Sequence, residues 1–342
     1  MARRVGKPIG PTCNRTDQAE HSRYMLATPH MTAMVVPNEG GRVSSLLDKQ
    51  TNVEFLMQAP YPRRLRTHSV DARFEDGAPG GIEECLPSVG ACGAWGDNWA
   101  IPDHGDFWQL SWQVEMYAES TLRQSATGFS RPLQIHKELS VNGRCLQIIY
   151  RISNLANEPT AFLYACHPLL AVDEGDVVLL PDEVTSVLLN YSRDERIGRP
   201  GDWVSWPLTH TLGQDLSVVL LPKANTAEMF YTKRLTEGWA AVYRTAARQG
   251  IVVRFRTDEL PYLGVWLCYG GWPNCGDEPR QYAVALEPIT APYGTLCEAE
   301  EQNAAIELAA GGEYCFEIAF SVSDPDVSLD AFRKFCEGTA EA

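Results

Sequence analysis

The stretch "LQIHKELSVNGRCLQIIYRISN", residues 133–154, indicates the fold class of this chain most clearly. Two runs in which apolar and polar residues alternate flank the dipeptide Asn142-Gly143. Alternation with a period of two places the apolar side chains on one face of a β-strand. The Asn-Gly dipeptide favours the positive φ angles of a type I′ turn. The stretch therefore predicts a hairpin of two long antiparallel strands with one buried face.

The same alternation recurs along the chain, for example in "GIVVRFRT" (250–257) and "EYCFEIAFSV" (313–322). Further short apolar runs predict strands at 216–222, 227–233, 239–245, 262–272 and 282–288. Only "SLDAFRKFCEG" (328–338) indicates a helix, with Ser328 as its cap. We therefore expect an all-β fold, a large antiparallel β-sandwich with few short helices. Residues 24–338 are expected to form one domain, preceded by a flexible N-terminal arm, residues 1–23.

The composition excludes several classes of function. The 342 residues carry a formal net charge of −15, which repels nucleic acid and anionic membrane surfaces. No apolar run reaches the roughly 18 residues of a membrane-spanning helix, and the polar start lacks the hydrophobic segment of a secretory signal. The 10 cysteines include no C-x-x-C pair. We therefore expect reduced thiols, no metal, and a cytoplasmic protein; the sequence does not specify its oligomeric state.

Two apolar runs end on a titratable residue followed by proline: "FLYACHP" at His167-Pro168 and "YAVALEP" at Glu287-Pro288. Proline removes a backbone donor, so we expect sheet pairing to end there. A histidine and a glutamate held at the rim of a rigid sheet can face a cleft and perform acid–base chemistry near neutral pH. The alternative is that both are hydrogen-bonded core residues.

His104 lies in a loop rich in glycine, proline and aspartate, within "IPDHGDFWQLSW" (101–112), and is a third candidate for the site or a plain surface residue. The chain also contains 9 tryptophans. Flat indole rings can stack on the C–H faces of a sugar, although most tryptophans fill the core of a large sandwich. Trp272, on the glycine-rich segment "YGGWPNCG" (269–276), is the tryptophan we most expect in a cleft, and Trp266 is a second candidate.

Five segments occur in the order found in the aldose 1-epimerase (galactose mutarotase-like) family, which the chain resembles over about residues 31–323. They are "GGRVSSLLD" (40–48), "GGIEECLPSVG" (80–90), "DHGDFW" (103–108), "YACHPLLAVDEGDVVLLP" (164–181) and "VALEPITAP" (284–292). The resemblance implies a galactose mutarotase-like supersandwich with a sugar cleft, a small-molecule sugar as substrate and no cofactor.

The resemblance also implies catalytic roles. Glu287 matches the general base that takes the proton from the anomeric hydroxyl, and His167 matches the general acid that protonates the ring oxygen. His104 matches a second histidine that helps to hold the ring oxygen or a neighbouring hydroxyl. The ring opens, the C1–C2 bond rotates, and closure gives the other anomer. We add Glu83, Glu84 and Asp202 as candidate sugar-binding residues.

The chain departs from the family pattern in two places. Pro79 precedes Gly80-Gly81 where the hexose-6-phosphate branch has arginine, which argues against a phosphorylated sugar. His167 follows Tyr164-Ala165-Cys166, where the galactose branch has an Asn-x-Thr-His context.

Two other functions stay open. One is a lyase or epimerase of sugar acids or keto-sugars on the same fold, with metal ligands drawn from Glu83, Glu84, His104 and His167. The other is a carbohydrate-binding protein without catalysis.

Overall fold

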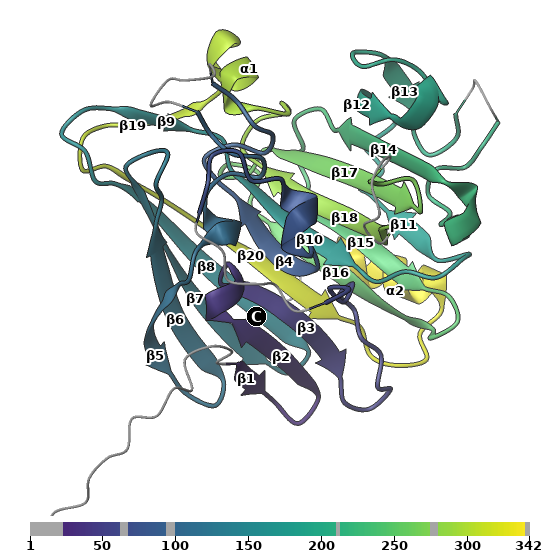
Figure 1. The fold of residues 1–342 in the computed structure, drawn as a ribbon. Helices are drawn as coiled ribbons and strands as arrows, with labels where there is room; N and C mark the ends of the chain where they lie inside the picture. Colours follow the sequence, from purple (N-terminus) through teal and green to yellow (C-terminus); the bar gives the residue numbers. More distant parts are fainter. Residues whose placement is uncertain (1–22, 62–67, 94–99, 210–212, 274–279, 339–342) are drawn as a thin grey trace, which may run out of the picture.

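The computed structural model describes residues 23–61, 68–93, 100–209, 213–273 and 280–338. Its strands form two large antiparallel sheets that face each other (Figure 1). This confirms the predicted all-β sandwich. The predicted N-terminal arm lies outside the described residues except for Arg23. No helix in these described ranges has the length and apolar character needed to cross a membrane.

The first sheet has ten strands in the order β1-β2-β3-β4-β10-β18-β17-β14-β12-β13. Their bounds are β1 Tyr24–Ala27, β2 Met31–Val36, β3 Arg42–Asp48, β4 Gly81–Cys85, β10 Ala165–Leu170, β12 Ser186–Ser192, β13 Trp203–Ser205, β14 Thr226–Tyr231, β17 Tyr262–Tyr269 and β18 Tyr282–Ile289.

The second sheet has eight strands in the order β11-β15-β16-β20-β8-β7-β6-β5. Their bounds are β5 Gln113–Tyr117, β6 Thr121–Thr127, β7 Leu133–Asn142, β8 Cys145–Asn154, β11 Val177–Leu179, β15 Trp239–Arg244, β16 Gln249–Phe255 and β20 Glu313–Val322. A separate pair joins β9 Thr160–Phe162 to β19 Ile306–Leu308.

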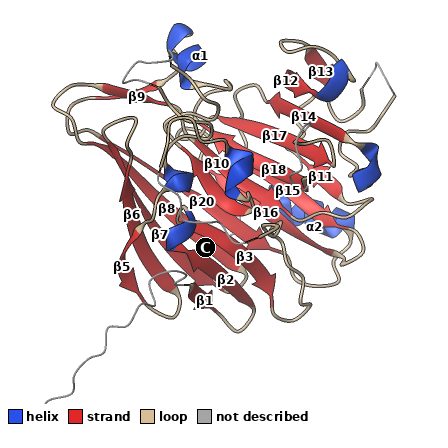
Figure 2. Cartoon of the chain, viewed as in Figure 1, coloured by secondary structure: helices blue, strands red, loops and turns tan. Residues whose placement is uncertain are grey.

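Helices and 3₁₀ turns are short and are spread among the strands (Figure 2). The two α-helices are α1 Leu296–Glu301 and α2 Leu329–Glu337. The Ser328 hydroxyl accepts a hydrogen bond from the backbone of Ala331, so the predicted C-terminal helix and its cap are confirmed. The 3₁₀ turns are η2 Pro37–Glu39, η3 Phe74–Gly77, η4 Phe107–Gln109, η5 Arg193–Glu195 and η6 Pro222–Ala224.

The hairpin of residues 133–154 forms as the alternation predicts. Its ladder runs from the pair Leu133↔Asn154 to the pair Asn142↔Cys145, and Gly143 has a φ of +57° in the turn. Every second residue of β7 and β8 is buried against the first sheet. The strand predicted at 216–222 is wrong, because this segment makes only one isolated bridge, from Val218 to Val177 of β11, and then enters η6.

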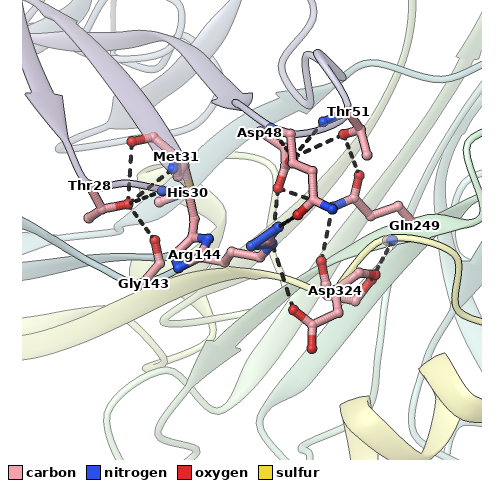
Figure 3. A network of polar contacts seen from close by, with 12 residues as sticks. Thr28, His30, Met31, Asp48, Thr51, Gly143, Arg144, Gln249 and Asp324 are labelled. Carbon is pink, nitrogen blue, oxygen red and sulfur yellow. Dashed lines mark hydrogen bonds and ion pairs between the residues drawn. The ribbon is translucent and has the colours of Figure 1, made fainter.

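A polar network closes one end of the sandwich and joins both sheets (Figure 3). Asp48, fully buried at the end of β3, accepts hydrogen bonds from the backbone of Gln50 and from the backbone and hydroxyl of Thr51. Its other oxygen contacts Arg144 of the β7–β8 turn at 3.0 Å and Gln249 of β16 at 3.2 Å. One carboxylate thus holds three segments that are far apart in the chain.

We predict that Asp48→Asn lowers the free energy of unfolding at pH 7 by about 2 kcal/mol, because a hydrogen bond to a buried charge is worth roughly 1.5–3 kcal/mol. Burial alone would raise the pKa of Asp48, but the hydrogen bonds from Thr51 and Gln50 and the charge of Arg144 lower it below 3.8. A carboxyl group whose pKa is lower in the folded than in the unfolded state stabilises the fold at pH values above the unfolded-state pKa. The difference in free energy of unfolding between the wild type and Asp48→Asn should therefore shrink as pH falls below that pKa.

Denaturant titrations at several pH values would test this. Asp258→Asn is the matched control, since the Arg256–Asp258 pair is exposed and worth little. A difference that persists unchanged into acid would contradict the assignment.

Candidate active site

A row of four residues crosses the middle of the ten-stranded sheet. Glu83 on β4 pairs with His167 on β10, and Glu287 on β18 pairs with Gly264 on β17. The β10–β18 register, Ala165↔Ile289 and Leu169↔Ala285, places His167 opposite Glu287. Directly opposed residues lie on the same face of a sheet. The histidine and glutamate predicted at strand ends therefore meet on neighbouring strands.

The two prolines interrupt the sheet locally and do not end it, which corrects the sequence prediction. The ladder between β10 and β18 lacks residues 166–168, where Pro168 and Pro288 remove donors, and it resumes at Leu169. On its other edge, β10 pairs with β4 without a gap from Ala165 to Leu169. The continuous ladder with β4 is sufficient to hold β10, while the ladder between β10 and β18 is open around His167 and Glu287.

A cavity of about 480 Å³ opens over this row. Its wall includes His167, Glu287, His104, Trp266 and Trp272, which are five of the residues predicted from the sequence. His167 and Glu287 are almost fully buried, and the His167 Nε2 atom lies 3.8 Å from a Glu287 carboxylate oxygen. This is the volume and the mixed lining of a small-molecule site.

Gly264 provides the space for Glu287. A Cβ atom at position 264 would lie 3.2 Å from the Glu287 Cβ atom and 2.9 Å from the Met229 Cε atom. A side chain at position 264 would therefore crowd the base of the Glu287 side chain, and glycine leaves this space open.

His104 reaches the same place from the loop between β4 and β5. Its ring lies perpendicular to the His167 ring, with centroids 5.1 Å apart, and stacks on Phe74 at 4.0 Å. The His104 Nδ1 atom lies 2.9 Å from an Asp103 oxygen. His104 has a φ of +59°, a strained conformation for a residue with a side chain. Such strain is typical of functional sites.

The three titratable groups have different electrostatic environments. Burial raises the pKa of Glu287 to about 7, against the opposing effect of His104. Burial and the neighbouring His104 lower the pKa of His167 to about 3. Burial also disfavours the charged form of His104, but Asp103, Glu287 and Glu83 together raise its pKa above 6.5. At neutral pH, His167 is therefore uncharged and Glu287 is close to half ionised.

Three predicted sugar-binding residues do not line the cavity. Glu83 lies on the same face but is buried beneath its wall. Glu84, the next residue along β4, points to the opposite face, where Lys137 Nζ lies 2.9 Å from both carboxylate oxygens. Asp202 is exposed and accepts a hydrogen bond from the backbone of Arg199. The alternation of side chains along a strand separates Glu83 from Glu84.

The far end of the cavity is aromatic. Trp272 stands at 84° to both Trp266 and Tyr191, with ring centroids 6.1 and 5.8 Å away. Tyr191 and Trp266 are tilted by 37° to each other. The three rings form a corner of apolar surface suited to the C–H faces of a pyranose.

The wall residues that sequence reasoning missed include Phe74, Asp103, Asn190 and Tyr191. Asp103 adjoins His104, so its charge was a usable signal. The other three come from segments with no polar pattern that points to a cleft.

Within the part of the chain that the structure describes, no three or more His, Cys, Asp or Glu side chains are grouped so as to hold a metal ion. Four of the described cysteines, Cys85, Cys166, Cys268 and Cys336, are buried free thiols.

We predict that Lys137→Met lowers the free energy of unfolding by about 3–5 kcal/mol, because it leaves Glu84 buried without its cation. The double change Lys137→Met with Glu84→Leu should recover most of this loss, since replacing both partners of a buried pair by apolar groups is often neutral. Chemical denaturation of the three proteins tests this. If the double variant were as unstable as the single one, the pair would not be what holds β4 to β7.

Comparison with known proteins supports the same architecture. No protein-family model and no curated protein sequence matches the chain. Solved structures match along most of its length. A galactose mutarotase-like protein from Clostridium acetobutylicum gives a TM-score of 0.62 at 15% identity, covering 90% of this chain and 96% of its own.

Two other structures are similar to the same extent. A galactose mutarotase-like protein from Lactobacillus casei gives 0.61 at 15% identity, covering 88% and 100% of the two chains. The GalM/aldose epimerase homologue from C. elegans gives 0.61 at 13%, covering 90% and 100%. The chain therefore has the galactose mutarotase-like fold.

Proposed function

We propose that the protein is an aldose 1-epimerase-like mutarotase, an isomerase that interconverts the α and β anomers of a sugar. The observation that carries the proposal is the convergence of Glu287, His167 and His104 on one cavity from three separate segments. The fold shared with galactose mutarotase-like proteins supports it. Fold alone does not define an activity, so the proposal rests on this site.

The chemistry needs a base at the anomeric hydroxyl and an acid at the ring oxygen. Glu287, with a pKa of about 7, is suited to accept the hydroxyl proton at neutral pH. As C1=O1 forms, the bond from C1 to the ring oxygen breaks and a histidine protonates that oxygen. Rotation about C1–C2 and the reverse transfers give the other anomer. No cofactor takes part in these steps.

The cavity favours an uncharged free sugar. Pro79 lies in its wall, where the sequence comparison expected an arginine for a phosphosugar. Among the described lining residues, Arg280 is the one lysine or arginine, while Glu75, Asp103 and Glu287 are acidic. The aromatic corner offers stacking surface, and Asn190 and Gln281 offer hydrogen bonds for sugar hydroxyls.

We predict that Glu287→Gln abolishes anomer exchange, with a loss of at least about 10²-fold, because an amide of the same shape cannot act as a base. The variant should fold and melt at no lower temperature, since it removes a buried charge. NMR of freshly dissolved α anomers of glucose, galactose, and several deoxy and uronic sugars measures the rate.

Glu313→Gln, at an exposed ion pair on the other sheet, should keep the full rate. If Glu287→Gln exchanged a confirmed substrate at the wild-type rate, the proposed base would be wrong.

The rate should also depend on pH. Burial raises the pKa of Glu287 to about 7, so the ionised base is lost as pH falls through that value. We therefore expect kcat/KM to rise from about pH 5.5 toward pH 7 along an ascending limb that reports Glu287. A rate that stays flat across that range would show that a different group is the base.

The same experiments separate the two alternatives. Chemical-shift changes on sugar addition without acceleration would indicate a carbohydrate-binding protein. The lyase or sugar-acid epimerase becomes the better candidate if no sugar is bound or exchanged and metal analysis of the purified protein is positive.

A further inference from the structure

We propose that His104, held by Asp103, donates the proton to the ring oxygen, and that His167 acts as a neutral hydrogen-bonding partner beside it. Asp103 is then a positioning residue for His104. This inference rests on the proposed function and deepens it, since it assigns the acid to the loop histidine, whereas the family resemblance implies the strand histidine.

The Asp103 carboxylate is itself fixed on both sides. One oxygen lies 2.9 Å from His104 Nδ1, and the other accepts a hydrogen bond from the backbone of Phe74 at 3.1 Å. The backbone carbonyl of Asp103 accepts a further bond from the Trp108 indole at 2.8 Å. A carboxylate anchored in this way cannot turn away from the imidazole.

His104 is held just as firmly. The Phe74 ring stacks on it within 10° of parallel, and the His104 backbone donates to the carbonyl of Val89 at 2.6 Å. Because Asp103 engages Nδ1, Nε2 is the nitrogen that can reach a bound sugar. A carboxylate on Nδ1 favours the doubly protonated ring, which is the form that can donate from Nε2.

His167 has the opposite surroundings. Its Nδ1 atom is buried and has no hydrogen-bond partner among the described residues. Its Nε2 atom lies 3.8 Å from Glu287, beyond hydrogen-bond distance. The His167 ring also abuts the His104 ring at 5.1 Å. Positive charges on two adjacent imidazoles repel each other, so His104, which contacts the Asp103 carboxylate, keeps the proton.

Three carboxylates favour a protonated His104, and one of them, Asp103, also acts to raise the pKa of His167. Asp103 comes from its own loop, Glu83 from β4 and Glu287 from β18, and each raises the pKa of His104. The positive charge on His104 in turn lowers the pKa of His167 on β10. Glu287 and His104 thus flank a neutral His167, with the acid and base on its two sides.

The transfers balance. Glu287 takes the proton from the O1 hydroxyl as the C1–O5 bond breaks, and the His104 Nε2–H proton goes to O5. The products are the open aldehyde, a neutral His104 and a protonated Glu287. After rotation about C1–C2, His104 takes the proton back from the O5 hydroxyl, O5 attacks C1, and Glu287 returns its proton to O1.

Imidazole NMR titration of the intact protein without sugar tests the protonation order, with His104→Gln and His167→Asn used to assign the signals. We expect His104 to titrate at a higher pH than His167. Asp103→Asn keeps the side-chain shape and removes the charge, so the pKa of His104 should fall toward or below that of an ordinary histidine. Asp258→Asn, an exposed aspartate, should shift neither histidine.

The pH profile of anomer exchange tests the transfer itself. An acid must be protonated, so the rate should fall as pH rises through the pKa of His104. Asp103→Asn should move this descending limb to lower pH and reduce the rate at pH 7 about 10-fold or more. The limb should vanish in His104→Gln and persist in His167→Asn, even where the latter is slower.

Two results would overturn the inference: His167 titrating above His104, or the descending limb vanishing in His167→Asn and persisting in His104→Gln. Either would refute it even when exchange is observed. If the histidines titrate in the expected order but no sugar is exchanged, the proposed function and the transfer step fail together. The order in which His104 and His167 take up a proton would then be established without a catalytic role.

Discussion

The ion pair between Lys137 and Glu84 is the contact on which the arrangement of the site depends. Both side chains are fully buried between the sheets. Lys137 also donates to the carbonyl of Gly41 at 2.7 Å and lies over the Trp112 ring, and the Tyr150 hydroxyl reaches Glu84 at 3.2 Å. The lysine and the tyrosine belong to β7 and β8, so the pair ties the second sheet to β4. The pairing with Lys137 directs the Glu84 side chain into the space between the two sheets.

That direction sets the register of β4. A slip by one residue would put Glu83 in the place of Glu84, but it would also move Ile82, a residue of the core between the sheets, to the opposite face. With β4 fixed, β10 and β18 follow through their ladders, and His167 and Glu287 are placed opposite each other. His167 and Glu287 are therefore held by paired strands, and the ladder between β10 and β18 is open next to Pro168 and Pro288.

Much of this architecture could be predicted from local pattern. Alternation identified the hairpin of residues 133–154, and apolar runs identified the strands that carry His167 and Glu287. The apolar run at 216–222 led to a wrong prediction, because it makes only one isolated bridge to β11 and continues as a loop and a 3₁₀ turn. Glu83 and Glu84 could not be assigned, because adjacent carboxylates look alike until a partner from another strand selects one of them. Asp202 was misplaced, since it is exposed and lies outside the wall of the cavity.

The sequence by itself determined the class of fold and the identity of the groups that meet in the cavity. Periodicity and turn-forming residues act over a few positions, so they can be recognised in the sequence. Only the tertiary structure decided how those groups are charged. His104 forms a hydrogen bond with Asp103, the residue that precedes it in the chain. Its contacts with Phe74 and His167, in contrast, come from segments 30 and 63 residues away in the sequence. Protonation depends on burial and on the charges within a few ångströms, and those are set by packing.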